Sequence, residues 1–310
     1  MVAAVGLLRS RPQGEAPTTP TATAAPTVVV IGPVDGCRAG PRFQASLGLG
    51  PRAALTTALT DVKGLAVLDP DGNEGQGRVY QHETWDDAGY LGPFITDRHG
   101  HIYTAPVPLV SLVDNPPEQQ NRIYRVDSDT QEMALYVELP WAQPPSGANP
   151  FGVVGLAYDC ETESLYASSL AGSTARQEVG RLFRVDLTTG QVAAHHDGVD
   201  AMGLAVFNGV DGKRLYYGLA RRPEVWSVGL DPAGNFVGEP RREFSYGEHA
   251  VGGRRTARRI RFQGGDTMVL NLMDFNYTLQ VAGQRREDVL FYRYDPAAAR
   301  WDFVRIEAAQ

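Results

Sequence analysis

Carboxylates and carboxamides lie at the edges of several apolar, alternating segments of this sequence. Asp200 stands in VDAMG just before one apolar run, and Asn149 stands in NPFG before another. In DFNY, Asp274 and Asn276 are two residues apart, so on an extended strand they share one side, where they can hold a cation or a sugar hydroxyl. The structural alternative is turn capping by Asn149 and Asp200, and strand-end hydrogen bonding by the other pair.

A basic cluster lies in GGRRTARRIRF and contains five arginines, namely Arg254, Arg255, Arg258, Arg259 and Arg261. If this segment is a strand, Arg259 and Arg261 share one face and Arg258 lies on the other. A buried guanidinium needs a carboxylate partner or an anionic ligand, because an unpaired buried charge is costly. We expect Arg258 and Arg259 to contribute to ligand binding, and a salt bridge to Asp200 or Asp274 is the structural alternative.

His249, in YGEHAVGG, is the best histidine candidate for acid–base chemistry, with Asp200 as a second catalytic candidate. A solvated loop position is the alternative for this histidine. The sequence contains no GxSxG, P-loop, HExxH or CxxC motif, so a serine nucleophile has no support. We expect no nucleotide or flavin cofactor.

Four aromatic residues lie near polar positions in the same loop regions. This combination suits the recognition of a small molecule or glycan. The predicted ligand-binding aromatics are Trp85, Tyr90, Trp141 and Tyr246.

The elements that would position these residues are strands, because alternating apolar segments punctuated by Gly, Asp and Pro recur and helical periodicity is nearly absent. Two kinds of hairpin follow one another, as in GLAYDCETESLYASS and LFRVDLTTGQVAAH. Together they make four complete units at residues 90–140, 151–199, 200–247 and 255–307, and part of a fifth at 64–85. Such repeats predict an all-β fold, a β-propeller of four-stranded antiparallel blades.

The number of blades is left open by the first part of this domain. Five repeats can be counted, and residues 28–60, with TVVVIGPV and RAALTTALT, supply inner strands of the first blade or part of a sixth. The connections on one face are short, as in DRHG and LTTG, whereas those on the other face are long and varied. Long loops on a rigid scaffold often carry function, so we expect the binding surface at the channel mouth on the long-loop face.

The composition of the chain limits the classes of partner that we expect the protein to bind. The 310 residues are 43% hydrophobic and 21% charged, with 36 acidic and 29 basic residues and a net charge of −7. A chain without a broad basic footprint is a poor candidate for nucleic-acid binding, and no apolar run is long enough to span a bilayer. We expect a single domain at 28–310, acting as a monomer.

Residues 1–27 combine a short apolar stretch with EAPTTPTATAAPT, a composition that favours an extended tether. We expect a disordered N-terminal tether, possible membrane anchor or export-signal remnant, and an exported protein that is periplasmic, tethered to the cell envelope or secreted. Cys37 and Cys160 are the two cysteines. They form one disulfide in an exported chain and are separate thiols in a cytoplasmic one.

The phrases NPFGVVGLAYDCETESLYASS and VDAMGLAVFNGVDGKRLYYGLA resemble inner hairpins of the senescence marker protein, gluconolactonase and strictosidine synthase group. The resemblance covers most of residues 62–307 and is greater still to uncharacterised exported bacterial propellers. It implies a six-bladed propeller, in whose metal-dependent lactonases an acidic residue, an Asn and an Asp line the channel. Asn149 and Asp200 match two of these positions, and no Glu stands at the start of the first inner strand.

Two functions follow. The first is an extracytoplasmic module that binds a small molecule or glycan at the channel mouth. The alternative is a lactonase-like or esterase-like hydrolase in which one divalent cation, calcium first, polarises a carbonyl and activates water. Its metal ligands would be Asn149, Asp200, Asp274 and Asn276.

Overall fold

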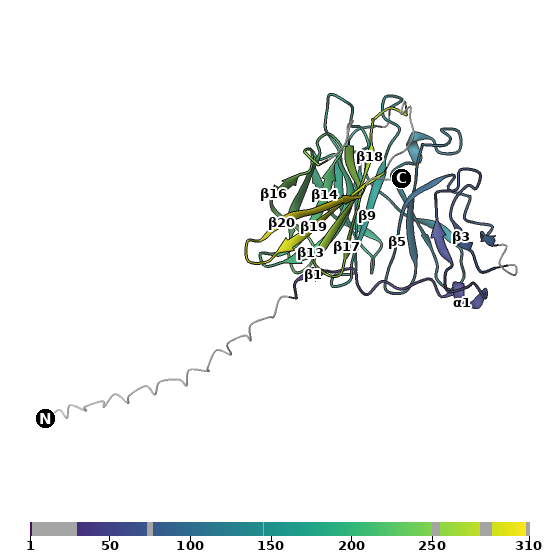
Figure 1. Cartoon of the computed structure of the whole chain (residues 1–310), viewed down its shortest axis with the longest axis horizontal. Coiled ribbons are helices and arrows are strands. Elements are labelled where there is room, and N and C mark those ends of the chain that lie inside the picture. Colours follow the sequence, from purple (N-terminus) through teal and green to yellow (C-terminus); the bar gives the residue numbers. More distant parts are fainter. Residues whose placement is uncertain (2–29, 73–76, 145, 250–254, 280–286, 308–310) are drawn as a thin grey trace.

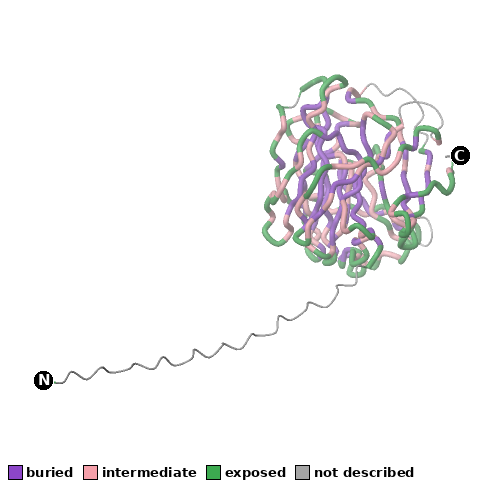
Figure 2. The backbone as a smooth tube through the Cα atoms, turned by 90° about the vertical axis from the view of Figure 1, so that its left-hand side faces the viewer, coloured by how far each residue is buried: buried purple, intermediate pink, exposed green. Residues whose placement is uncertain are grey.

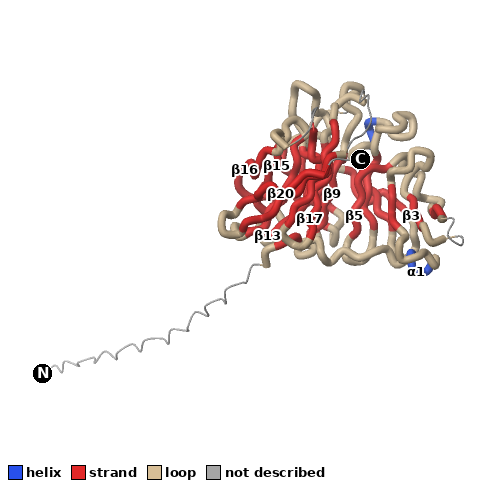
Figure 3. The backbone as a smooth tube through the Cα atoms, in the orientation of Figure 1, coloured by secondary structure: helices blue, strands red, loops and turns tan. Residues whose placement is uncertain are grey.

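The computed structural model describes residues 30–72, 77–144, 146–249, 255–279 and 287–307, together with Met1. Within these residues the chain is almost entirely strand and loop (Figures 1 and 3), with one short helix, α1 (Phe43–Ser46), and one 3-10 turn, η2 (Pro117–Gln119). No helix in the described part is long and apolar enough to cross a bilayer. The tether predicted for residues 1–27 lies outside the described residues.

The strands form five antiparallel sheets arranged as a β-propeller. Blade one contains β2 (Ala54–Thr56), β3 (Ala66–Asp69) and β4 (Arg78–Tyr80). Blade two contains β5 (Leu91–Thr96), β6 (Ile102–Pro106), β7 (Arg122–Val126) and β8 (Met133–Glu138). Blade three contains β9 (Val153–Asp159), β10 (Ser164–Ser169), β11 (Arg181–Asp186) and β12 (Gln191–Asp197). Blade four contains β13 (Ala201–Gly209), β14 (Gly212–Leu219), β15 (Glu224–Leu230) and β16 (Phe236–Ser245), and blade five β17 (Arg255–Gln263), β18 (Thr267–Asp274), β19 (Asp288–Asp295) and β20 (Arg300–Glu307).

Strand order within each blade follows chain order, and the first strand of each blade lines the central cavity. The four predicted units coincide with blades two to five, which confirms the fold class. The segment before blade one differs from the prediction in part. RAALTTALT supplies β2, the inner strand of blade one, but TVVVIGPV supplies β1 (Gly32–Pro33), which pairs with Asn208 and Phe207 of blade four.

Neighbouring blades are held together by apolar layers between their faces, seen as the buried interior in Figure 2. Separate hydrophobic clusters join blades one and two, two and three, three and four, and four and five. Among the described residues, no such cluster joins blade five to blade one. The face of blade five turned away from blade four is therefore not buried by an apolar partner of that kind.

Two glycines explain how the inner strands approach one another. A Cβ at Gly155 of β9 would lie 2.0 Å from the carbonyl oxygen of Met202, and one at Gly203 of β13 would lie 2.7 Å from that of Arg258. The glycine in each GLA phrase is thus required by close backbone contact with the next blade. These contacts set the spacing around the cavity.

Residues 34–42, which we call the strap, run from β1 to α1 across the ends of several blades. Val34 N–H bonds to Val206 of blade four, Cys160 N–H of blade three bonds to Val34, and Ala39 N–H bonds to Asp97 of blade two. All three blade residues lie toward the turns that join first and second strands, and Figure 1 shows this stretch passing along that end of the propeller. The strap therefore crosses the cavity on the face of short turns.

Candidate functional site

The described residues enclose a central cavity of about 480 Å³, within the usual range for small-molecule sites. Segments of β2, β5, β9, β13 and β17 form its walls, and Asp35 and Arg38 of the strap contribute to its lining. Each of these strands pairs with its own blade through one edge, and β13 also pairs with β1 at Phe207 and Asn208. The remaining backbone N–H and C=O groups on the inner edges face this space. The cavity is thus polar in part even where its side chains are apolar.

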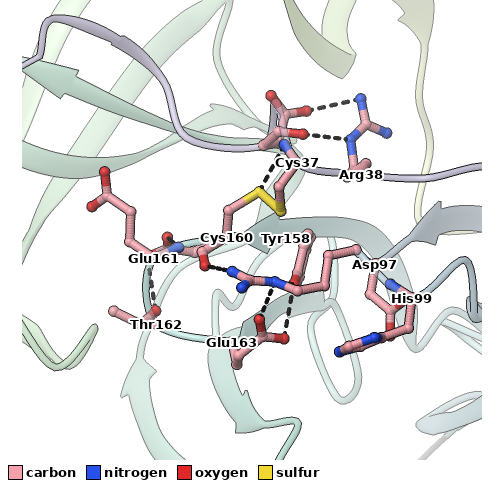
Figure 4. The surroundings of a disulfide bond; sticks show 12 residues. Cys37, Arg38, Asp97, His99, Tyr158, Cys160, Glu161, Thr162 and Glu163 are labelled. Carbon is pink, nitrogen blue, oxygen red and sulfur yellow. Dashed lines mark hydrogen bonds and ion pairs between the residues drawn. A yellow bond between two sulfur atoms is a disulfide. The ribbon is translucent and has the colours of Figure 1, made fainter.

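The strap is fixed at this end by a disulfide between Cys37 and Cys160, with Cα atoms 6.0 Å apart (Figure 4). The sequence left this pairing open, since the residues are 123 positions apart. Next to the bond, the Tyr158 hydroxyl donates to Glu163 at 2.8 Å and accepts from Arg98 at 3.4 Å. Tyr158 also lines the cavity, and burial is the main cause that raises its pKa to about 12. Its hydroxyl is therefore a neutral, fixed group.

One wall of the cavity, β17, differs from the others in charge. The inner strands of blades three and four contribute GLAY and GLAV, whereas β17 contributes Arg258, Arg259 and Arg261. The strand bulges between Ala257 and Arg259 and is regular from there to Gln263. Arg259 and Arg261 therefore share one face, as expected from the sequence.

The exposure of β17 side chains follows this alternation. Ile260 and Phe262 pack into the core shared with blade four, while Arg259 and Arg261 are exposed on the opposite face. Within the described residues, the side chains of Arg259 and Arg261 form no hydrogen bond or ion pair with the protein. Arg258 is half-buried and has an interaction of its own.

The cavity has an excess of positive charge. Among the described residues that line it, Asp35 is the one carboxylate, and it is paired with Arg38 at 2.9 Å. The two carboxylates considered as partners of the arginine cluster differ: Asp200 pairs outside the cluster, whereas Asp274 lies beside Arg255, the first residue of β17. Asp200 pairs with Arg221 at 2.9 Å, and Asp274 lies 3.8 Å from Arg255.

Asp200 is fully buried at the start of β13, and four donors occupy its carboxylate. One oxygen accepts from Ser173 Oγ and from Gly180 N–H at 3.0 Å. The other accepts from Arg221 Nε at 2.9 Å and from Tyr277 Oη. Burial, and then this carboxylate, raise the pKa of Tyr277, which keeps its proton for the bond. Asp200 is therefore a structural anchor for the surrounding loops.

Asn149 is also committed to the backbone. Its Nδ2 donates to Leu170 O at 2.7 Å, its Oδ1 accepts from Phe151 N–H at 3.0 Å, and its side chain is buried. Beside it, Phe151, Leu170 and Tyr277 of the loops form an apolar cluster with Met202 of β13. The turn-capping alternative describes Asn149 better than a ligand-binding role.

The other two predicted metal ligands lie at the end of β18 and just after it. Asp274 ends β18 and is half-exposed, while Asn276 is exposed in the following turn, where its Oδ1 accepts from Thr278 N–H at 3.1 Å. Since the strand ends at Asp274, the pair does not share an extended face. No group of three or more His, Cys, Asp or Glu side chains within the described ranges is placed to hold a metal ion. Within the described residues, the side-chain oxygens of Asn149 and Asp200 already accept hydrogen bonds from the protein.

The predicted aromatic residues lie outside the cavity lining. Trp85 and Tyr246 are core residues, and both are 0% exposed. The indole N–H of Trp85 donates to Gln131 O at 2.7 Å, and Tyr246 Oη accepts from Ala257 N–H at 2.9 Å. Their burial between blades excludes the predicted contact with a ligand.

Tyr90 and Trp141 are half-buried in loops and also take no part in lining the cavity. The Tyr90 backbone is bonded to Asn115, whose side chain accepts from its N–H at 2.7 Å. Trp141 O accepts from Arg181 at 3.1 Å. The backbones of both residues are held by interactions with their own blades.

His249 is stacked on Phe303 of β20, with ring centroids 3.7 Å apart and planes at 10°. Because β20 is the last, outer strand of blade five, this stack lies at the rim of the propeller. Its one charged neighbour in the described chain is Glu248, at 3.4 Å. The position does not suit acid–base chemistry at the central cavity.

Of the predicted residues, Arg258 and Arg259 do lie at the cavity. Arg261, Tyr158 and the strap pair Asp35 and Arg38 were not among the predicted site residues. The alternation in RRIRF already carried the signal for Arg261, since it shares a face with Arg259. The strap residues had no such signal, because they reach the cavity through tertiary contacts.

No family model and no curated protein matches the sequence. Among solved structures of similar fold, the periplasmic gluconolactonase PpgL of Pseudomonas aeruginosa is 15% identical, with a TM-score of 0.47 over 84% of this chain and 70% of its own. A protein of unknown function from Bacteroides caccae is 12% identical, with a TM-score of 0.45 over 83% and 73%. A luciferin-regenerating enzyme is 11% identical, with a TM-score of 0.42 over 91% and 95%. At this distance, function has to be argued from the site.

Proposed function

We propose that this β-propeller is an extracytoplasmic protein that binds a small molecule in its central cavity. The observation that carries the proposal is the cavity of about 480 Å³, whose β17 wall presents Arg259 and Arg261 without partners in the described protein. A guanidinium without a partner in the protein is left to bind water or an oppositely charged ligand. A polar ligand supplies such a partner.

The binding position in this proposal is the interior of the channel. The polar residues at the long-loop mouth are engaged with one another, as Asp200 is with Arg221 and Tyr277. By contrast, the inner strands of all five blades contribute to one space. Catalysis is not part of the proposal.

The disulfide between Cys37 and Cys160 supports the extracytoplasmic assignment. Disulfides persist in the periplasm and outside the cell and are rare in the reducing cytosol. The disulfide also holds the strap, which contributes Asp35 and Arg38 to the cavity lining. An oxidising environment that preserves the disulfide therefore also preserves the binding site.

A cavity-filling variant tests the binding position. Thr56 lies on β2 in the cavity lining, and we expect Thr56→Trp to occupy space that a ligand needs. The purified protein is incubated with a bacterial metabolite extract, desalted and examined by native mass spectrometry. Wild type should retain a small molecule, and Thr56→Trp should retain at least about tenfold less, equivalent to about 1.4 kcal/mol.

The control is Thr189→Trp, in the exposed turn between β11 and β12, which adds the same side chain away from the cavity. It should retain the ligand as wild type does. Retention of nothing by wild type, or equal retention by wild type and Thr56→Trp, would contradict the proposal.

A further inference from the structure

We infer that the central cavity is an anion site, and that its ligand is a small organic acid held by Arg259 and Arg261. The inference deepens the proposed function and rests on it. It depends on three features of the described residues, namely the shared face of the two arginines, the lack of a countercharge and the polar walls around them.

The first feature is the geometry of β17. Regular pairing of Arg259 with Asn271 and of Arg261 with Val269 places the two side chains on one face, in successive outward positions. Each guanidinium is a planar fork of donors that matches a carboxylate or phosphate. Two such forks side by side can bind one acidic group between them or one group each.

The second feature is the missing countercharge. Asp274 and Asp288 pair with Arg255 at the start of β17, Asp200 pairs with Arg221, and Asp35 pairs with Arg38. None of these carboxylates is paired with Arg259 or Arg261. Two adjacent like charges repel, and in this cavity no described carboxylate is left to relieve them. An anion from solution supplies the charge that the fold does not.

The third feature concerns the uncharged part of the ligand. Opposite β17, the lining includes Thr56 of β2, Gly92 of β5 and the unpaired backbone edges of the inner strands. Thr56 Oγ1 accepts from Ala58 N–H at 3.1 Å, so its own proton can be donated. These groups suit an acid with additional polar substituents better than a fatty acid, whose chain would leave them unsatisfied.

Matched probes that differ only in charge test the inference. We would measure by calorimetry the binding of citrate, of succinate and of its uncharged isostere succinamide, and of inorganic phosphate, at constant ionic strength. We expect citrate or succinate to bind, and succinamide to bind at least about tenfold more weakly. Raising the salt concentration should weaken acid binding, because exposed charges are screened. Preference for phosphate over both acids would overturn the inference that the ligand is an organic acid, but would still indicate an anion site.

Arg259→Gln and Arg261→Gln should each weaken the binding of the better acid by about tenfold or more, in keeping with the loss of a charge-assisted hydrogen bond. Arg305→Gln is the control. Arg305 lies on the same face of blade five as Arg261, but on the outer strand β20 and outside the cavity lining. Unchanged melting temperatures would show that all three variants fold.

The outcomes separate the inference from the proposed function. Equal binding of succinate and succinamide, or acid binding that survives both arginine substitutions, overturns the anion site while leaving cavity binding in place. Absence of any effect of citrate, succinate or phosphate on wild type also overturns it. In the cavity-filling experiment, retention of nothing by wild type, or equal retention by wild type and Thr56→Trp, overturns the proposed function itself.

Discussion

Two charged regions of this propeller contrast in how their charges are satisfied. Around Asp200, the carboxylate is surrounded by donors from four residues, and its partner Arg221 also donates to the backbone of the loop at 174–177. On β17, Arg259 and Arg261 belong to the cavity lining, and their side chains have no partner among the described residues. The contrast separates charge that holds the fold together from charge that is available to a ligand.

The largest expected effect is a difference in stability between variants of the two regions. Asp200→Ala would leave Arg221 and Tyr277 partly buried without their acceptor, and we expect a loss of about 3–5 kcal/mol in the free energy of unfolding. Arg261→Gln, in the absence of ligand, should cost nothing measurable or raise stability by a few tenths of a kcal/mol, since it removes like-charge repulsion. Urea unfolding of both variants at neutral pH measures the difference. Similar losses for the two would remove the distinction between the regions.

Removing the disulfide tests whether the attachment of the strap to blade three contributes to the stability of the propeller. Replacing Cys37 and Cys160 together by serine removes a crosslink that spans 123 positions, and we expect a loss of about 2–4 kcal/mol in the free energy of unfolding. Unfolding of the oxidised wild type, the reduced wild type and the double variant gives the comparison. Reduced wild type and the double variant should have the same free energy of unfolding. A double variant as stable as oxidised wild type would show that the strap is held by its hydrogen bonds alone.

The smallest effect concerns Tyr158, which lines the cavity but has its hydroxyl paired within the protein. Its pKa is raised to about 12 from an ordinary value near 10, so the neutral form is favoured by folding. This contribution is fully present below about pH 10 and is lost as the pH rises toward about 12. We expect wild type to exceed Tyr158→Phe by about 1 kcal/mol at neutral pH and this excess to shrink over that interval.

Urea midpoints of wild type and Tyr158→Phe at several pH values measure the difference, and taking the difference cancels the titration of the other tyrosines. A pH-independent gap between the two proteins would show that the Tyr158 hydroxyl does not titrate in this window.

The repeated hairpins made most of the fold predictable from sequence. Alternation and turn residues act locally, so the units at 151–199 and 255–307 correspond closely to blades three and five. The path of residues 30–60 was not predictable in the same way. β1 adds to β13 through contacts between residues more than half the chain apart, which no local pattern encodes.

The site was predictable where strand alternation decides it and not where tertiary partners do. Side chains on a strand alternate between its two faces, which places Arg259 and Arg261 on one face, and the structure confirms this. The roles of Asp200 and Trp85 depend on Arg221, Tyr277 and Gln131, which reach them from other segments. A carboxylate before a strand looks alike in sequence whether it faces a ligand or an internal guanidinium.

The disulfide also constrains the order in which the protein can be assembled. Cys37 precedes all of blade one, whereas Cys160 follows β9, so the bond cannot form until the first strand of blade three has been synthesised. Once formed, it closes a loop of 123 positions that contains blades one and two and ends at the start of blade three. The strap that carries Cys37 is tied to blade four without a covalent bond, because Val34 N–H donates to the carbonyl oxygen of Val206.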